Sequence, residues 1–144
     1  MGNSSSNEKE EKKGGSNGKE YLEEIHKTDV DFEEKDGKMY VKGEKGTGFI
    51  AFYAPWCHFC TELAPAWNKY AKAMEGTSFH FLAVDCTDSK TANVVKKLQI
   101  SGYPTIKFID PKTKQVVPAQ YENGEGIQRT PEGFNKFLKE KKLL

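Results

Sequence analysis

Cysteine is scarce in this chain, which holds three among 144 residues. Small secreted domains stapled by disulfides use many more, so that class is excluded. The sequence also lacks the run of roughly 20 apolar residues that a membrane-spanning helix needs. The chain also lacks an excess of charge of one sign, because 22 basic and 21 acidic side chains leave a formal net charge of +1. We therefore expect no nucleic-acid partner, since such proteins normally carry a basic surface.

Apolar residues are nearly absent from the first 20 positions. Residues 1–20 hold eleven Gly, Ser or Asn and eight charged side chains, with Met1 as the single apolar residue. Such a segment cannot bury enough apolar surface to offset the entropy of ordering it, so we expect a disordered hydrophilic leader. Residues 21–144 are about 41% apolar. That length and composition suit one ordinary domain.

The leader begins Met-Gly-Asn-Ser-Ser-Ser, which fits the myristoylation pattern with Gly2 as the acceptor. The alternative is an unmodified flexible leader. One acyl chain holds a membrane only marginally, so we expect weak membrane association at most. The sequence shows neither a secretory signal nor a C-terminal retention motif, which favours the cytoplasm. The lumen of the endoplasmic reticulum is the alternative if the native N-terminus has been truncated.

Strand and helix patterns alternate through the rest of the chain. Residues 21–27 have weak helical spacing. Asp36-Gly37 lies between short alternating segments that start at Val30 and end at Val41, which predicts a β-hairpin. Residues 49–53 and 79–85 are apolar on both faces, which is typical of central strands in an α/β sheet.

Helices are predicted on either side of these strands. After Cys60, apolar residues at three- and four-residue spacing predict a long helix that Pro65 should kink. Residues 89–98 predict a short helix with Ala92 among its inward residues. Residues 105–109 and 115–117 predict a second hairpin, and Thr130 with Pro131 predicts the start of a last helix. We expect an α/β fold with a mixed central sheet and helices on both faces.

Cys57 and Cys60 are separated by two residues where a central strand gives way to a helix. A pair at a helix start can close a disulfide within one turn. It also places the first sulfur beside the unpaired N–H groups and the positive end of the helix dipole, which favours the thiolate. We therefore expect Cys57 to be the nucleophile and Cys60 the resolving thiol.

This segment resembles the active-site segment of protein disulfide isomerase domains, within the thioredoxin superfamily. The similarity covers Phe-Tyr-Ala-Pro-Trp-Cys-x-x-Cys at residues 52–60, Ala-Pro-x-Trp at 64–67, Val-Asp-Cys-Thr at 84–87 and Ser-Gly-Tyr-Pro-Thr-Ile-Lys-Phe at 101–108. The resemblance implies a thioredoxin-like three-layer sandwich. It also implies that Pro104 is cis and that the backbone of Tyr103 faces Cys57 and pairs with an extended substrate.

The chain departs from the family pattern in three ways. His58 follows Cys57, where the family usually has Gly and places its His next to the second cysteine. A protonated His58 would stabilise the Cys57 thiolate and make the pair more oxidising. The family's buried acid and its lysine partner are replaced by Ala51 and Ala83, so we expect slow resolution of mixed disulfides. The hairpin at residues 30–41 stands in place of the family's first helix.

Other residues near the pair have expected supporting roles. By the resemblance, Arg129 can swing toward Cys60 and favour its thiolate; a solvated arginine is the alternative. Trp56 is expected mostly in the core and partly in an apolar collar around Cys57. Cys86 is expected to be a structural thiol, and His26 and His80 to be ordinary histidines at sheet or surface positions.

The function that these residues predict is thiol–disulfide oxidoreduction of the protein disulfide reductase or isomerase type. No cofactor is expected beyond the redox-active Cys57–Cys60 disulfide, and no metal site. The expected partners are proteins with disulfides or thiols and an upstream reductase or oxidant, and the expected state is a monomer. The alternatives are a non-catalytic binding module that uses the groove beside Pro104 and, less favoured, a metal cluster shared between two Cys-x-x-Cys pairs.

Overall fold

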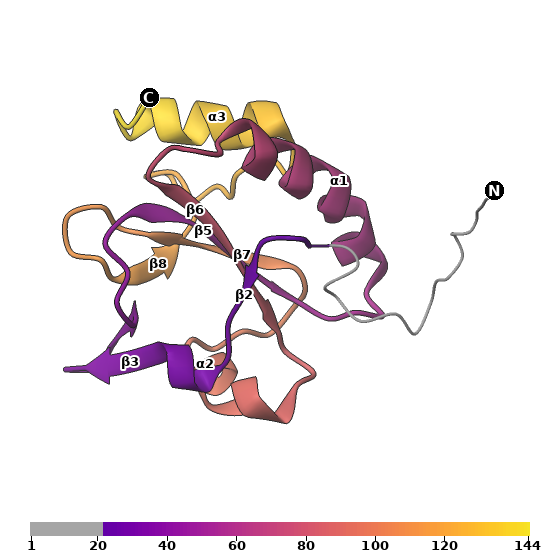
Figure 1. Ribbon diagram of the computed structural model, residues 1–144, viewed down its shortest axis with the longest axis vertical. Coiled ribbons are helices and arrows are strands. Elements are labelled where there is room, and N and C mark those ends of the chain that lie inside the picture. Colours follow the sequence, from indigo (N-terminus) through magenta and orange to yellow (C-terminus); the bar gives the residue numbers. More distant parts are fainter. Residues whose placement is uncertain (1–21) are drawn as a thin grey trace.

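The computed structural model describes residues 22–144 and centres on a five-stranded sheet (Figure 1). The expected leader and Gly2 lie outside the described residues. The strand order is β2-β6-β5-β7-β8. The strands are β2 (Ile25–His26), β5 (Thr47–Tyr53), β6 (Phe79–Asp85), β7 (Thr105–Ile109) and β8 (Val116–Pro118). β6 is parallel to β2 and β5, whereas β7 is antiparallel to both β5 and β8. The predicted mixed sheet is confirmed.

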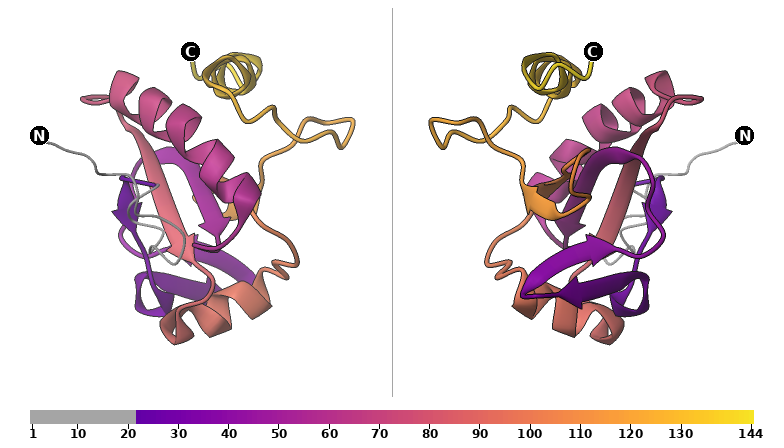
Figure 2. Two further views of the ribbon diagram at one scale, coloured as in Figure 1. Left: turned by 90° about the vertical axis from the view of Figure 1, so that its right-hand side faces the viewer. Right: turned by 90° about the vertical axis from the view of Figure 1, so that its left-hand side faces the viewer.

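Two layers cover the faces of this sheet (Figures 1 and 2). Helices α1 (His58–Ala73) and α3 (Pro131–Glu140) lie on one face. Helix α2 (Ala92–Lys97) and the hairpin of β3 (Phe32–Lys35) and β4 (Lys38–Val41) lie on the other. The arrangement is the expected three-layer sandwich. The segment between β8 and α3 projects away from the sheet (Figure 2).

The alternating side chains of β5 divide the core into two halves. All seven residues of β5 are buried. Phe49, Ala51 and Tyr53 belong to the half under α1 and α3, whereas Ile50 and Phe52 belong to the half under the hairpin and α2. The ring of Phe49 lies within 5.9 Å, centroid to centroid, of four others: Phe81, Phe108, Phe134 and Phe137. This aromatic packing fixes α3 on the sheet.

The N-terminal hairpin forms where the Asp-Gly signal predicts it. Asp36 and Gly37 take φ values of 53° and 77°, the left-handed conformations that a tight two-residue hairpin turn requires. The hairpin makes its own two-stranded sheet and buries Phe32, Met39 and Val41 against the main sheet. It occupies the position along the chain where the resemblance would place a helix.

Three local predictions are wrong. The spacing at residues 21–27 predicts a helix, but residues 25–26 form β2, because pairing with the free edge of β6 outweighs a weak local pattern. Val30 lies in a short 3-10 helix, Asp29–Asp31, and is 75% exposed. In α2 the buried residue is Val94, and Ala92 is exposed. None of the helices within residues 22–144 has the length and apolar character to cross a membrane.

Candidate functional site

The two cysteines lie where β5 passes into α1. Cys57 is the N-cap residue of α1, and its N–H donates to the carbonyl of Ala54 at 3.1 Å. Cys60 is in the first turn, and its N–H donates to the carbonyl of Cys57 at 3.1 Å. Both are free thiols, 9% and 2% exposed. The helix start thus brings the sulfurs to one end of the buried core.

A loop distant in sequence completes the site. The Tyr103–Pro104 peptide bond is cis, as the resemblance implies. The Cys57 thiol donates to the carbonyl oxygen of Tyr103, with 3.5 Å between sulfur and oxygen. The Arg129 guanidinium donates to the carbonyl oxygen of Pro104 at 3.3 Å. The site therefore joins the start of α1, the loop before β7 and the loop before α3.

The Cys60 thiol holds its proton more tightly than an ordinary cysteine does. Burial is the main cause, and it raises the pKa of Cys60 to about 12. The backbone N–H bonding at Ala54 acts in the opposite direction, the adjacent Cys57 raises the pKa further, and the positive charge of Arg129 lowers it. Arg129 thus favours the Cys60 thiolate, although its side chain bonds to Pro104 rather than to the sulfur.

Exposed aromatic side chains stand on both sides of Cys57 in the sequence. Trp56 is 69% exposed and Phe59 is 58% exposed, so the prediction that Trp56 is mostly core is wrong. The rings of Trp56 and Tyr103 meet edge to face with centroids 5.8 Å apart. Trp67, by contrast, is fully buried. Trp56 and Phe59 therefore present apolar surface to solvent close to Cys57 in the chain, and the collar stays a prediction.

His58 lies mostly in solvent and faces its own helix. Its Nε2 is 3.3 Å from a carboxylate oxygen of Glu62, one turn further along α1. A protonated His58 would form an ion pair with the Glu62 carboxylate. The sequence identifies His58 as a neighbour of Cys57, but the Glu62 contact depends on the helix that brings residues four apart together.

The two alanines that replace the family's buried pair are neighbours. Ala51 on β5 lies directly beside Ala83 on β6, and neither is exposed. Within residues 22–144, the buried polar residues outside the apolar core are Thr47 and Thr91. The described core therefore holds no buried carboxylate or lysine beside Cys60.

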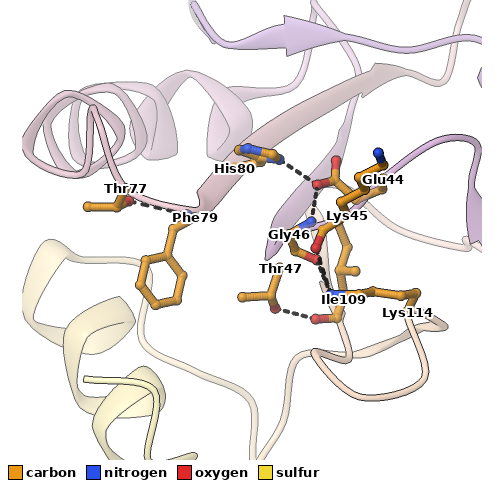
Figure 3. Close-up of polar contacts among 9 residues, drawn as sticks. All are labelled: Glu44, Lys45, Gly46, Thr47, Thr77, Phe79, His80, Ile109 and Lys114. Atoms are coloured by element: carbon orange, nitrogen blue, oxygen red, sulfur yellow. Dashed lines mark hydrogen bonds and ion pairs between the residues drawn. The ribbon is translucent and has the colours of Figure 1, made fainter.

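Two histidine contacts were missed by the sequence reasoning. The Nδ1 atom of His26 lies 3.3 Å from the Tyr53 hydroxyl oxygen. His80 Nδ1 lies 2.6 Å from a carboxylate oxygen of Glu44, at the opposite end of β6 (Figure 3). Both histidines lie on strands, as expected, but each contacts a side chain that the sequence did not indicate. Both partners are distant in sequence, so only the strand register could have indicated them.

Cys86 follows β6 and is half-buried. Its thiol donates weakly to the carbonyl of Val84, with sulfur and oxygen 3.7 Å apart. Burial, chiefly, raises its pKa to about 12, which makes it a poor nucleophile. In the described part of the chain, no three His, Cys, Asp or Glu side chains are grouped so that they could hold a metal ion.

The chain is similar to known proteins. The family model for thioredoxin matches residues 23–140. A thioredoxin domain-containing protein of Theileria parva is 44% identical over 92 residues, which are 64% of this chain and 37% of the relative. The protein disulfide-isomerase of Oryctolagus cuniculus is 39% identical over 95 residues, 66% of this chain and 17% of the relative.

A solved structure extends the likeness to three dimensions. The first thioredoxin domain of mouse protein disulfide-isomerase A4 is 26% identical, with a TM-score of 0.53, and the match covers 78% of this chain and 80% of that domain. The matches to the two curated relatives span well under half of each relative's length. The family match covers most of the chain, and this chain belongs to the thioredoxin family.

Proposed function

We propose that this protein is a thiol–disulfide oxidoreductase that acts on the disulfides or thiols of other proteins. The observation that carries the proposal is the contact between Cys57 Sγ and the Tyr103 carbonyl oxygen, at 3.5 Å. It sets the more accessible sulfur beside a backbone segment to which an extended substrate could bind. Family membership supports the same chemistry.

In the first proposed step the Cys57 thiolate attacks a substrate disulfide. A Cys57–substrate disulfide forms, the substrate S–S bond breaks, and the leaving thiolate takes up a proton. Cys57 is the N-cap residue of α1, the end of the helix at which the first N–H groups are unpaired within it. The exposed Trp56 and Phe59 would contact apolar side chains of the substrate.

In the second proposed step Cys60 resolves the mixed disulfide. Its thiolate attacks Cys57 Sγ, the Cys57–Cys60 bond forms, and the substrate leaves as a thiolate. The step requires Cys60 to lose a proton that burial retains, and the charge of Arg129 assists that loss. An upstream reductase returns the pair to the dithiol, or an oxidant drives the sequence in reverse. We propose that the protein acts as a monomer in the cytoplasm.

The test is turnover of a protein disulfide with and without the nucleophile. Wild type should accelerate reduction of insulin by dithiothreitol, and Cys57→Ser should abolish that acceleration because serine cannot form the mixed disulfide. Equal activity of the two proteins would contradict the proposal. Inactivity of both would favour a binding module that keeps the fold, and visible absorbance of the purified protein would favour a cluster.

A further inference from the structure

Arg129 is the single arginine among the 22 basic residues of this chain, and the other 21 are lysines. A guanidinium differs from an ammonium because it is planar and presents its N–H donors in a fixed fork, which suits a position where one particular acceptor must be held. A lysine would supply the same charge to the surface. The choice of arginine at this position therefore indicates a hydrogen-bonding role beyond charge.

The acceptor that Arg129 holds is the carbonyl oxygen of Pro104, at 3.3 Å. Pro104 is buried, whereas Arg129 lies at the surface. A buried carbonyl that loses its donor destabilises the arrangement around it. A hydrogen bond from a charged donor is also stronger than one between neutral groups. The bond therefore ties the loop before α3 to the residue at which β7 is about to begin.

The backbone on both sides of Arg129 is fixed on α3. The Thr130 hydroxyl accepts from the Gly133 N–H at 3.0 Å and caps the helix. The Gln128 carbonyl packs so closely on the helix that a Cβ atom at Gly133 would lie 2.2 Å from its oxygen. Glycine inside a helix is less favourable than alanine, so this close approach is the structural reason for it. The guanidinium of Arg129 thus extends from an anchored backbone.

The segment that Arg129 contacts also meets the nucleophile. The Thr105 hydroxyl donates to the Gly102 carbonyl at 2.7 Å, which closes the turn internally. That bond sets the shape of the turn, but it connects the turn to no other element. Arg129 supplies a hydrogen bond from another element. Between these contacts, the Tyr103 carbonyl oxygen lies 3.5 Å from Cys57 Sγ.

We propose that Arg129 is a positioning residue that holds the Tyr103–Pro104 segment beside Cys57 and thereby sets how tightly an extended substrate binds. This inference rests on the proposed function, in which the backbone of Tyr103 pairs with the substrate. A segment that is already held in place does not have to be ordered when the substrate arrives, so less binding energy is lost. The effect of Arg129 in this role falls on binding and not on the sulfur chemistry.

The experiment separates this role from the effect of the Arg129 charge on the pKa of Cys60. The full chain with Cys60→Ala and Cys86→Ala keeps Cys57 as its one thiol. One probe is an uncharged octapeptide whose central cysteine is linked by a disulfide to thionitrobenzoate. The other is N-acetylcysteine methylamide linked to the same group. In both, Cys57 attacks the cysteine sulfur and thionitrobenzoate leaves, but only the octapeptide can pair along the Tyr103 backbone.

Loss of the guanidinium should weaken binding of the octapeptide alone. Arg129→Met should raise the octapeptide concentration that gives the half-maximal rate about tenfold, the equivalent of one hydrogen bond, and leave the limiting rate within about twofold of the parent. Its rate with the single-residue probe should match the parent. Lys139→Met removes an exposed cation of α3 and is the control for net charge, so both probes should react with it as with the parent.

A second variant moves Arg129 without replacing it. Gly133→Ala should displace the Gln128 carbonyl and with it the start of the Arg129 side chain. It should raise the same octapeptide concentration, and it should add nothing to the effect of Arg129→Met when the two are combined. Urea denaturation of each variant gives the folded fraction to which the rates are referred. Fully additive effects would contradict a shared cause.

Two results would overturn the inference alone. An unchanged half-maximal octapeptide concentration in Arg129→Met would confine Arg129 to its effect on Cys60. An equal fall in rate with both probes would assign the effect to charge near the sulfur. If the parent releases thionitrobenzoate from the single-residue probe no faster than the same protein unfolded in urea, the proposed function fails instead. The two failures are distinguishable because different probes report them.

Discussion

The two ends of the central strands β5 and β6 are built differently. At their beginning, Glu44 accepts from the Gly46 N–H at 2.8 Å and contacts His80, and Lys114 donates to the carbonyls of Lys45 and Gly46 at 2.9 and 3.0 Å (Figure 3). The Thr47 hydroxyl donates to the carbonyl of Ile109 in the same region. At their carboxyl ends, Cys57 and Cys60 meet few polar side chains.

The beginning of the two strands therefore contributes mainly to stability, and their carboxyl ends carry the thiol chemistry. Hydrogen bonds hold the loop that enters β5, because each buried donor or acceptor left unpaired there would cost free energy. The carboxyl end instead combines apolar burial with a thiol whose proton is hard to remove. We therefore expect changes at the beginning of the strands to alter unfolding and changes at the carboxyl end to alter thiol exchange.

The largest effect on stability is expected at Gly48. Its φ is +149°, and a Cβ atom there would lie 1.8 Å from the carbonyl oxygen of His80. Gly48→Ala should lower the free energy of unfolding by about 3 kcal/mol, measured by urea denaturation. Gly126→Ala is the control, since its Cβ would have no heavy atom within 4 Å. Equal stability of the two variants would contradict this account.

Glu44 tests the polar end directly. Its side chain is 8% exposed, and one oxygen contacts both the Gly46 N–H and His80 Nδ1. Glu44→Ala should cost about 2 kcal/mol in the free energy of unfolding, because both donors lose their acceptor. Insulin reduction per folded molecule should be unchanged. Lys45→Ala is the exposed control. A loss of activity in Glu44→Ala without a loss of stability would contradict the assignment of stability to this end of the strands.

A substitution at Ala51 tests the part of the molecule that carries the thiol chemistry. A carboxylate at this position would offer Cys60 a nearby proton acceptor, so Ala51→Glu should raise the rate of mixed-disulfide resolution about tenfold. Reduced protein in a Cys86→Ala background releases one thionitrobenzoate from 5,5′-dithiobis(2-nitrobenzoate) when Cys57 attacks and a second when Cys60 resolves the mixed disulfide. The rate of the second release measures resolution. Because a lone buried charge is destabilising, Ala51→Glu with Ala83→Lys is the paired variant, and the two positions are neighbours across the strands. A rate that is unchanged or slower in both would contradict the prediction.

The smallest effect is a loss of stability in alkali. Burial raises the pKa of Cys60 from 9.0 to about 12, so the folded state holds this proton more tightly than the unfolded state does. The resulting stability is present below pH 9 and is lost as the pH rises toward 12. Between pH 8 and pH 10 the reduced protein should lose about 1 kcal/mol more than Cys60→Ala does, measured by urea denaturation at each pH. An equal loss in both proteins would contradict it.

Strong local patterns in the sequence predicted most of the fold. The Asp36-Gly37 turn, the apolar runs of β5 and β6, and the Thr130 cap all form as expected, and the Thr130 hydroxyl accepts from the Gly133 N–H at 3.0 Å. Weak patterns failed. Residues 25–26 became a strand because the edge of β6 offered unpaired N–H and carbonyl groups, which no local spacing reveals.

The sequence predicted those parts of the candidate site that lie within short motifs. Cys57, Cys60 and Pro104 were identified from motifs, and the structure brings Cys57 to the carbonyl of Tyr103, the residue before Pro104. Trp56 was misassigned because an aromatic residue in an apolar segment reads as core, whereas the turn after β5 directs this one to solvent.

The sequence by itself determined the order of strands and helices after β2 and the cysteine pair at a helix start. These follow from local spacing and residue type, which act over a few positions. The resemblance to the family added that Ala51 and Ala83 replace its buried charged pair. Only the tertiary structure decided that His26 meets Tyr53, that His80 meets Glu44 and that Ala51 lies beside Ala83. Such contacts join residues far apart in the chain, so they depend on which strands pair and in which register.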